Sequence, residues 1–439
     1  KSENMKVFVG TLVHSTGEVL MQIRQAAVGV QGERIIFVED VTKLNELKEK
    51  HNLPVSSIVH LTTSQFLMPG LVDSHVHASQ FPNNGLHLGT PLLEWLEKYT
   101  FPTERSFADV KVAEKVYPRV VDRMLRNGTT TASYFATAHL PATKVLAATT
   151  AAKGQRALVG KVNMLMNCPE NYREESVEES LRETEEFISY TESLKSPLVQ
   201  PIVTPRFAIT CPEDHMRALG ALASKHKCRV QSHLCESEPE KELVKKIFPD
   251  FPSYTYLYHA MGLLTDKTIM AHCVWLDDEE VRLLAEKRAG VSHCPNSNLN
   301  LLSGHCNVKK LLQHGVKVGL GTDCSAGYSS SVLDAMRRAL HVSCSVGMEH
   351  SKHDVLTLPE AFHLATLGGA QVVSMDDCIG NFVVGKEFDA ILVDVDVPDS
   401  PLDIYDQDTM EDKIQRFLYN GDDRNMVEVY VAGRRVVAR

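Results

Sequence analysis

Two histidines two positions apart, His75 and His77, have the residue type and spacing to bind one metal ion. Residues two apart on a β-strand project from the same face, so both imidazoles can reach an ion about 2.1 Å away. The pair alone is weak evidence, because 19 histidines in 439 residues produce about one such pair by chance. Two structural histidines with satisfied hydrogen bonds are therefore the alternative unless other ligands join them.

Other metal-ligand residue types close further short apolar runs of the sequence. His233 and Glu236 close one run, His272 lies near the end of the next, and Asp323 closes the last. If each run is a strand of a parallel barrel, the reactive groups gather where the strands end. Chance convergence of ligands from separate segments is improbable, so we expect a metal site. The predicted ligands are His75, His77, His233 and Asp323.

This ligand set combines imidazole nitrogen and carboxylate oxygen without thiolate. It suits Zn²⁺, or iron in some settings, better than magnesium or calcium. A bound divalent cation lowers the pKa of water from about 15.7 to about 7, whereas positioned acid–base groups alone contribute about 10²–10⁴-fold. The sequence therefore predicts a zinc-dependent hydrolase.

Glu236 and His272 are the predicted catalytic side chains beside the metal. Glu236 lies three residues beyond His233, where it could be solvated or, next to a metal, carry a proton. His272 could be a further ligand, a buried structural residue or a group that orients the attacking water, and we favour the third role. A nearby cation disfavours protonation of an imidazole, so we expect His272 to be neutral.

Short β-branched apolar runs that alternate with helical patterns must position these residues. Strands alternating with helices indicate right-handed parallel βαβ units, and eight such units suggest an α/β fold, a closed (β/α)8 TIM barrel. The predicted strands are 66–77, 128–135, 157–164, 199–211, 229–236, 268–276, 290–295 and 316–323, and predicted helices include 110–126, 174–194 and 277–287.

Both ends of the chain differ from this middle part, because they read as short strands around turn residues. We predict strands at 6–12, 22–30 and 35–38, further strands within 380–393, and a hairpin at 427–437. The predicted organisation is a small composite β-sandwich domain of residues 1–66 and 377–439 beside a metal-dependent catalytic barrel of residues 67–376.

Composition narrows the classes of partner. The chain has 46 Lys and Arg against 56 Asp and Glu, a formal charge of −10 and no basic stripe, which argues against nucleic acid or an anionic membrane as partner. No apolar run approaches the roughly 18 residues of a membrane helix, and residues 1–15 lack a secretory signal layout. We therefore expect a cytoplasmic protein. Its ten cysteines form no CxxC pair, so we expect them to be reduced thiols.

The acidic stretch 170–192 is predicted to be a solvated helix face rather than a cation site.

The chain resembles the metal-dependent amidohydrolase superfamily along nearly its whole length, and within it the enzymes that deaminate guanine. The segments that carry the resemblance are 68–80 (MPGLVDSHVHASQ), 91–96 (PLLEWL), 127–131 (NGTTT), 204–207 (TPRF), 293–299 (HCPNSNL) and 319–323 (GLGTD). PGLVD and GTD mark the superfamily only. Arg206-Phe207 together with His77-Ala78-Ser79-Gln80 is the more specific combination.

The resemblance implies one Zn²⁺ per chain and the hydrolysis of guanine to xanthine and ammonia, a reaction of purine catabolism. Activated water would attack C2, Asp323 would take the water proton, and Glu236 would pass a proton to the purine ring. His272 would hold the attacking oxygen. The resemblance also implies a homodimer.

Purine recognition is assigned by the same resemblance to Gln80, Arg206, Phe207 and Trp95. The chemistry is suitable, because Arg206 can donate to the guanine carbonyl, Gln80 can donate and accept, and Phe207 offers a stacking face. A surface arginine and core aromatic residues are the alternatives for these positions. Trp95 is as compatible with core packing as with the pocket.

The sequence departs from the family pattern at two positions. Ala326 stands where paired glycines often follow the aspartate of the last strand, and Phe81 stands where tyrosine is frequent. A methyl group at Ala326 is expected to affect pocket shape but not metal ligation. No lysine lies close to Arg206 on the fourth strand, which favours one metal over the binuclear arrangement of other family members.

Two alternative functions stay open from the sequence. The same scaffold serves adenosine-type, cytosine and triazine deaminases or chlorohydrolases, and it could also be a catalytically silent binding module. The zinc deaminases with H-x-E and P-C-x-x-C motifs are excluded, because neither motif occurs in the chain.

Overall fold

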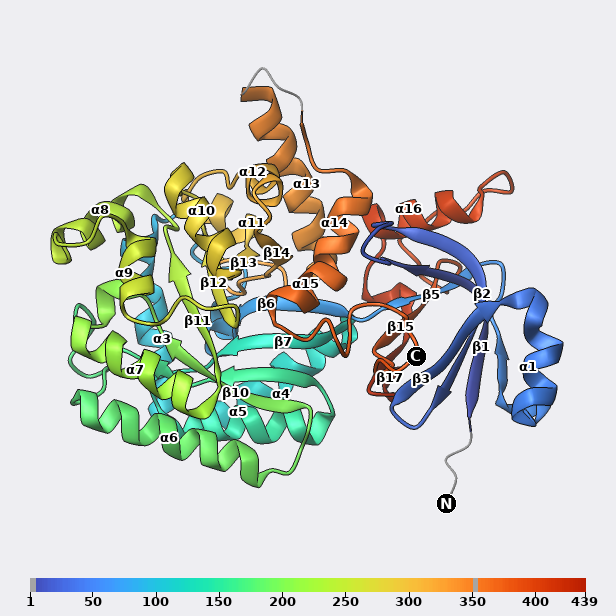
Figure 1. Ribbon diagram of the computed structural model, residues 1–439, viewed down its shortest axis with the longest axis horizontal. Helices are drawn as coiled ribbons and strands as arrows, with labels where there is room; N and C mark the ends of the chain where they lie inside the picture. Colours follow the sequence, from blue (N-terminus) through green and yellow to red (C-terminus); the bar gives the residue numbers. More distant parts are fainter. Residues whose placement is uncertain (1–4, 350–353) are drawn as a thin grey trace.

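The barrel strands follow one another around the sheet in the order of the sequence (Figure 1). The computed structural model describes residues 5–349 and 354–439. All neighbouring barrel strands that pair are parallel, and β9 (Val162–Asn163) pairs with β10 off the main path. The predicted (β/α)8 barrel is confirmed. Its strands are β6 (Leu71–His77), β7 (Thr129–Phe135), β8 (Arg156–Gly160), β10 (Val199–Pro205), β11 (Arg229–Leu234), β12 (Thr268–His272), β13 (Gly290–His293) and β14 (Lys317–Leu320).

The seam between the first and last barrel strands is closed by backbone hydrogen bonds at the residues that carry the site. The amide of Asp323 donates to the carbonyl of His75 at 2.9 Å, and the amide of His77 donates to the carbonyl of Cys324 at 3.2 Å. The end of β6 and the segment that follows β14 are therefore held together at the carboxyl end of the barrel.

Helices follow most of the strands, and several begin at residues that cap them. Asp109 accepts from the amide of Lys111, and Asp277 forms a capping box with Glu280. The predicted helices 110–126, 174–194 and 277–287 are confirmed by α4, α6 and α10. The helices of the barrel region are α2 (Leu92–Trp95), α3 (Phe101–Arg105), α4 (Val110–Arg126), α5 (Leu140–Lys153), α6 (Val177–Ser193), α7 (Glu213–His226), α8 (Glu238–Ile247), α9 (Tyr254–Ala260), α10 (Asp278–Lys287), α11 (Pro295–Asn300), α12 (Val308–Gln313), α13 (Val332–Glu349), α14 (Leu358–Ala365) and α15 (Leu367–Val372).

The two ends of the chain meet in a second sheet beside the barrel, where the blue and red strands of Figure 1 lie together. β5 joins the ends, because it pairs parallel with β1 and antiparallel with β15. The predicted β-domain built from both termini is therefore confirmed. Its elements are β1 (Lys6–His14), β2 (Gln22–Gln31), β3 (Arg34–Asp40), α1 (Leu44–His51), β4 (Ile58–His60), β5 (Gln65–Pro69), β15 (Ala390–Asp394), α16 (Met410–Asn420), β16 (Met426–Val431) and β17 (Arg434–Ala438).

The predicted first barrel strand, 66–77, is two strands in two different sheets. The chain leaves β5 at Gly70, where a Cβ atom would lie 2.1 Å from Oγ1 of Thr130. The chain therefore passes so close to β7 at this point that only glycine fits. Because β5 extends to Pro69, it crosses the predicted boundary at residue 66. The domain division itself stays a prediction, and its residues 1–4 and 350–353 lie outside the described part of the chain.

The segment 380–389 was expected to contain a strand but forms turns instead. Its pairing with the sheet is the isolated bridge between Arg34 and Glu387. Two glycines with positive φ, Gly380 and Gly385, bend this segment, so the apolar run between them does not extend into a ladder. The predicted hairpin at 427–437 is confirmed by β16 and β17.

The acidic segment 170–192 lies mostly on the protein surface, as expected for a solvated helix face. Among its acidic residues Glu174 is the exception, because it is buried just before α6 and forms an ion pair with the buried Lys161 after β8. Among the described residues, no helix has the length and apolar character needed to cross a membrane.

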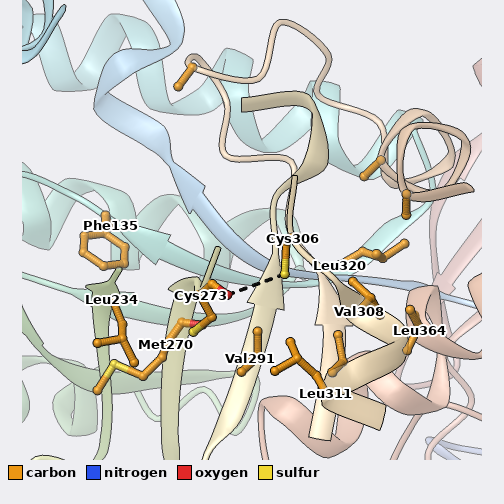
Figure 2. Packing of buried hydrophobic residues seen from close by; sticks show 14 of the residues in the cluster. Phe135, Leu234, Met270, Cys273, Val291, Cys306, Val308, Leu311, Leu320 and Leu364 are labelled. Atoms are coloured by element: carbon orange, nitrogen blue, oxygen red, sulfur yellow. Dashed lines mark hydrogen bonds between the residues drawn. The ribbon is translucent and has the colours of Figure 1, made fainter. Parts of the chain in front are cut away.

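Buried apolar side chains fill the space around the strands that carry the site (Figure 2). Leu234, Met270, Val291 and Leu320 come from consecutive strands and are fully buried in one cluster. The thiol of Cys306 donates to the carbonyl of Cys273 at 3.6 Å within this cluster. All ten cysteines are free, which agrees with the expected reduced thiols. This close packing gives the strand ends fixed positions.

A buried ion pair connects the barrel to the β-domain, and we predict that breaking it destabilises the fold. Arg156 of β8 donates to Asp389 at 2.9 and 3.2 Å and to Glu387 at 2.7 Å. Arg156→Met keeps the aliphatic stem but leaves a buried carboxylate unpaired, so the free energy of unfolding should fall by about 3–5 kcal/mol. Urea unfolding followed by circular dichroism measures this change. The control Lys43→Met breaks an exposed pair with Glu39 and should alter stability little; equal effects would contradict the prediction.

Candidate active site

The predicted metal ligands come together at the carboxyl end of the barrel. Nε2 of His75 lies 3.2 Å from Oδ1 of Asp323, and Nε2 of His77 lies 3.5 Å from the same oxygen. Nε2 of His77 is also 3.2 Å from Nε2 of His233. Asp323 lies three residues past the end of β14, and its backbone has a φ of +44°, an uncommon conformation for a residue other than glycine. The four side chains are buried and reach one point from β6, β11 and the end of β14.

The chemistry of these side chains fits a divalent cation. Ring nitrogens of His75, His77 and His233 that could bind an ion lie within 4.8 Å of one another. Nδ1 of His233 lies 2.6 Å from the carbonyl oxygen of Arg206, so Nδ1 carries the proton and Nε2 presents a lone pair. Burial, together with the neighbouring histidines, lowers the pKa of His77 and His233 well below its ordinary value. Neutral imidazoles facing a carboxylate are a suitable zinc environment.

His272 and Glu236 lie beside the predicted metal ligands. Nε2 of His272 is 3.3 Å from Oε2 of Glu236 and 3.7 Å from Oδ2 of Asp323. Nδ1 of His272 is 2.8 Å from Oδ1 of Asn298, which places the proton on Nδ1 and leaves the Nε2 lone pair toward the site. Burial raises the pKa of Glu236 well above its ordinary value, and the charge of Asp323 adds to this effect. The shift favours the protonated form of Glu236, which suits a proton donor.

Asp73, which the sequence analysis did not select, connects the first and last ligand segments. Its carboxylate accepts from the amide of Thr322 at 3.0 Å, from the Thr322 hydroxyl at 2.5 Å and from the amide of His75 at 3.2 Å. Burial raises the pKa of Asp73 to about 6, although these hydrogen bonds oppose the shift. Its place two residues before His75 in the family-like segment 68–80 was the available signal.

A cavity adjoins the cluster. Every predicted site residue except His75 lines it, and Leu92, Leu96 and Leu301 add apolar walls that the sequence analysis did not identify. Ala326 lines the cavity, as expected for the methyl group near the site, whereas Phe81 packs in a separate apolar cluster. The lining residues are His77, Gln80, Leu92, Trp95, Leu96, Arg206, Phe207, His233, Glu236, His272, Leu301, Asp323 and Ala326.

The polar residues at the far side of the cavity share one buried carboxylate. Arg206 donates to both oxygens of Glu104, at 2.6 and 3.2 Å, and Nε2 of Gln80 donates to Glu104 at 2.9 Å. Tyr172 donates its hydroxyl to the same carboxylate at 2.7 Å. Glu104 was not identified from sequence, because it stands in a polar stretch without a recognisable motif.

Comparisons with known proteins agree with this geometry. The model of the Amidohydrolase family matches residues 66–436. The guanine deaminase of Mus musculus is 48% identical over 437 residues, which cover 98% of this chain and 96% of that protein.

Solved structures show the same relationship. The crystal structure of guanine deaminase from C. acetobutylicum with bound guanine in the active site superposes with a TM-score of 0.90 at 35% identity, covering 98% of this chain and 100% of that one. The E. coli guanine deaminase gives a TM-score of 0.89 at 32% identity over 99% of this chain and 100% of that one.

Proposed function

Because the chain belongs to the amidohydrolase family, we propose that it is a hydrolase that converts guanine to xanthine and ammonia. The observation that carries the proposal is the cavity in which Glu236, His272 and Asp323 face the purine-binding candidates Gln80 and Arg206. The similarity to guanine deaminases extends over nearly the whole chain, so it includes both sides of this cavity.

We propose that one zinc ion per chain is held by His75, His77, His233 and Asp323. Bound there, zinc would lower the pKa of water from about 15.7 to about 7 and so supply a nucleophile at neutral pH. The hydrogen bond from His233 to the carbonyl of Arg206 supports this assignment, because it fixes the tautomer that presents Nε2 to the ion.

Asp323, His272 and Glu236 each have a separate role in moving protons or orienting water. Asp323 accepts the proton of the attacking water, and the free Nε2 of His272 accepts a hydrogen bond that orients this water toward C2 of guanine. Glu236, whose pKa burial raises, delivers a proton to the ring nitrogen next to C2. The C2–N bond to the exocyclic amine breaks when Asp323 passes its proton to that nitrogen, so that ammonia leaves, and the proton of the new C2 hydroxyl returns to Glu236 as the carbonyl of xanthine forms.

Substrate binding follows from the opposite side of the cavity. Arg206 donates to the guanine carbonyl, Gln80 pairs with the purine edge, and Phe207 and Trp95 offer aromatic faces. Leu92, Leu96 and Leu301 add apolar walls to the cavity, which suit the flat faces of a purine base.

The resemblance also supports three finer proposals. The chain acts in purine catabolism, in the cytoplasm, and as a homodimer. Size-exclusion chromatography with light scattering measures the oligomeric state, and a mass equal to one chain would contradict the dimer.

The substrate proposal predicts that the purified, zinc-loaded protein releases ammonia from guanine at least about tenfold faster than from adenine or cytosine. The reason is that a cavity built around hydrogen-bonding groups rejects bases that leave those groups unpaired. A coupled ammonia assay measures the rates, with protein treated with a chelator as the inactive control. Guanine left intact while adenine, cytosine or a triazine is consumed would overturn the proposal.

A further inference from the structure

Glu104 is a fully buried carboxylate that holds two of the proposed purine-binding residues at once. Its Oε1 accepts from Gln80 at 2.9 Å and from Arg206 at 3.2 Å, and its Oε2 accepts from Arg206 at 2.6 Å and from Tyr172 at 2.7 Å. Glu104 itself is not among the residues that line the cavity. It lies in α3, in the segment between β6 and β7.

The contact with Glu104 fixes which end of the Gln80 amide faces the substrate. A carboxylate paired with arginine accepts hydrogen bonds but has none to donate, so the NH₂ group of Gln80 must be the end that faces Glu104. The carbonyl oxygen of Gln80 is consequently left buried without a hydrogen-bond partner among the described residues. Since Gln80 lines the cavity, this oxygen is available to accept from an N–H group of the substrate.

The same carboxylate fixes the Arg206 guanidinium. Both terminal nitrogens of Arg206 donate to Glu104, a bidentate geometry that sets the plane of the group. The ring of Phe101 lies 5.1 Å below the guanidinium carbon. Arg206 is buried, so without Glu104 it would be an uncompensated cation.

We propose that Glu104 is a positioning residue that sets purine specificity. Glu104 directs the acceptor of Gln80 toward an N–H group of the base and the donors of Arg206 toward a carbonyl of the base. Tyr172 in turn holds Glu104 by a hydrogen bond. The site thereby selects a base with an N–H beside a carbonyl, as guanine has, against 2,6-diaminopurine, in which an amine replaces the carbonyl. This inference rests on the proposed guanine hydrolysis.

Glu104→Gln tests the proposal, because it keeps the shape of the side chain but removes the charge and lets the Gln80 amide face either way. KM for guanine should rise about 10- to 100-fold with a smaller change in kcat, and the preference for guanine over 2,6-diaminopurine in kcat/KM should fall about tenfold or more. Adding Gln80→Ala to Glu104→Gln should give less than the sum of the single effects on free energy, because Glu104 acts through Gln80.

Two further variants separate positioning from simple loss of structure. Glu280→Gln makes the same change at a fully buried glutamate that pairs with Lys241 outside the cavity, and its KM and base preference should stay those of the unaltered protein. Tyr172→Phe removes only the hydroxyl that donates to Glu104, and it should raise KM for guanine about three- to tenfold. Folding of each variant is checked by circular dichroism.

The outcomes distinguish this inference from the proposed function. If the unaltered protein does not deaminate guanine, the proposed function fails. If it does, and folded Glu104→Gln keeps the original KM and base preference, the positioning role is wrong. Should Glu104→Gln fail to fold, Tyr172→Phe decides in its place, and an unchanged KM in that variant overturns the role.

Discussion

Replacing Glu236 by glutamine is expected to lower kcat for guanine by about 10²–10⁴-fold while zinc remains bound. Glutamine has nearly the same shape as glutamate but cannot deliver the proton that the purine ring needs. Because Glu236 is not among the proposed ligands, the metal content should not change. Steady-state kinetics together with elemental analysis of the same protein sample measures both quantities.

The matched control is Glu240→Gln. Glu240 is also fully buried, but its carboxylate accepts from the amides of Glu236 and Ser237 at the start of α8 and does not line the cavity. Glutamine can accept the same capping hydrogen bonds, so activity should fall only slightly. Full activity in Glu236→Gln would remove Glu236 from the mechanism.

Replacing Asp323 by alanine should remove both the metal and the activity. The remaining histidines lose the only carboxylate of the proposed ligand set, so zinc content should fall from about one ion per chain to a small fraction of that value. Without activated water or a proton acceptor, kcat should fall by on the order of 10⁴-fold or more. Elemental analysis and the ammonia assay check these results, and circular dichroism shows whether the chain is folded.

Asp408→Ala is the control for this second variant. Asp408 pairs with Arg416 at 2.9 Å in the β-domain and belongs to neither the cavity nor the ligand cluster. Its loss should leave zinc and turnover in place. Retention of zinc and activity in folded Asp323→Ala would show that the metal is held differently from the arrangement proposed above.

The sequence allowed the barrel and the cluster of reactive residues to be predicted for a physical reason. In a parallel barrel, every strand end points to the same face, so residues such as His75, His233 and Asp323 can be placed together without knowledge of loop structure. The strands themselves were recognisable because each is a short β-branched run bounded by turn residues or helical patterns.

Contacts between distant segments could not be predicted in this way. Glu104 contacts Gln80, Tyr172 and Arg206 across long stretches of sequence, and no local periodicity encodes such a meeting. The division of 66–77 at Gly70 was missed because the residues on both sides of Gly70, Phe66–Met68 and Leu71–Val72, are apolar. Only the approach of Thr130, which is a tertiary contact, shows why the chain changes sheets there.

The seam between β6 and β14 has a consequence for the lifetime of the folded protein. The amides of Asp323 and His77 close the barrel through the carbonyls of His75 and Cys324, so an ion held by these side chains would fasten both edges of the sheet. Separation of β6 from the segment after β14 would then require release of the ion first. This requirement would slow global unfolding. The metal would thus stabilise the barrel against unfolding in addition to activating water.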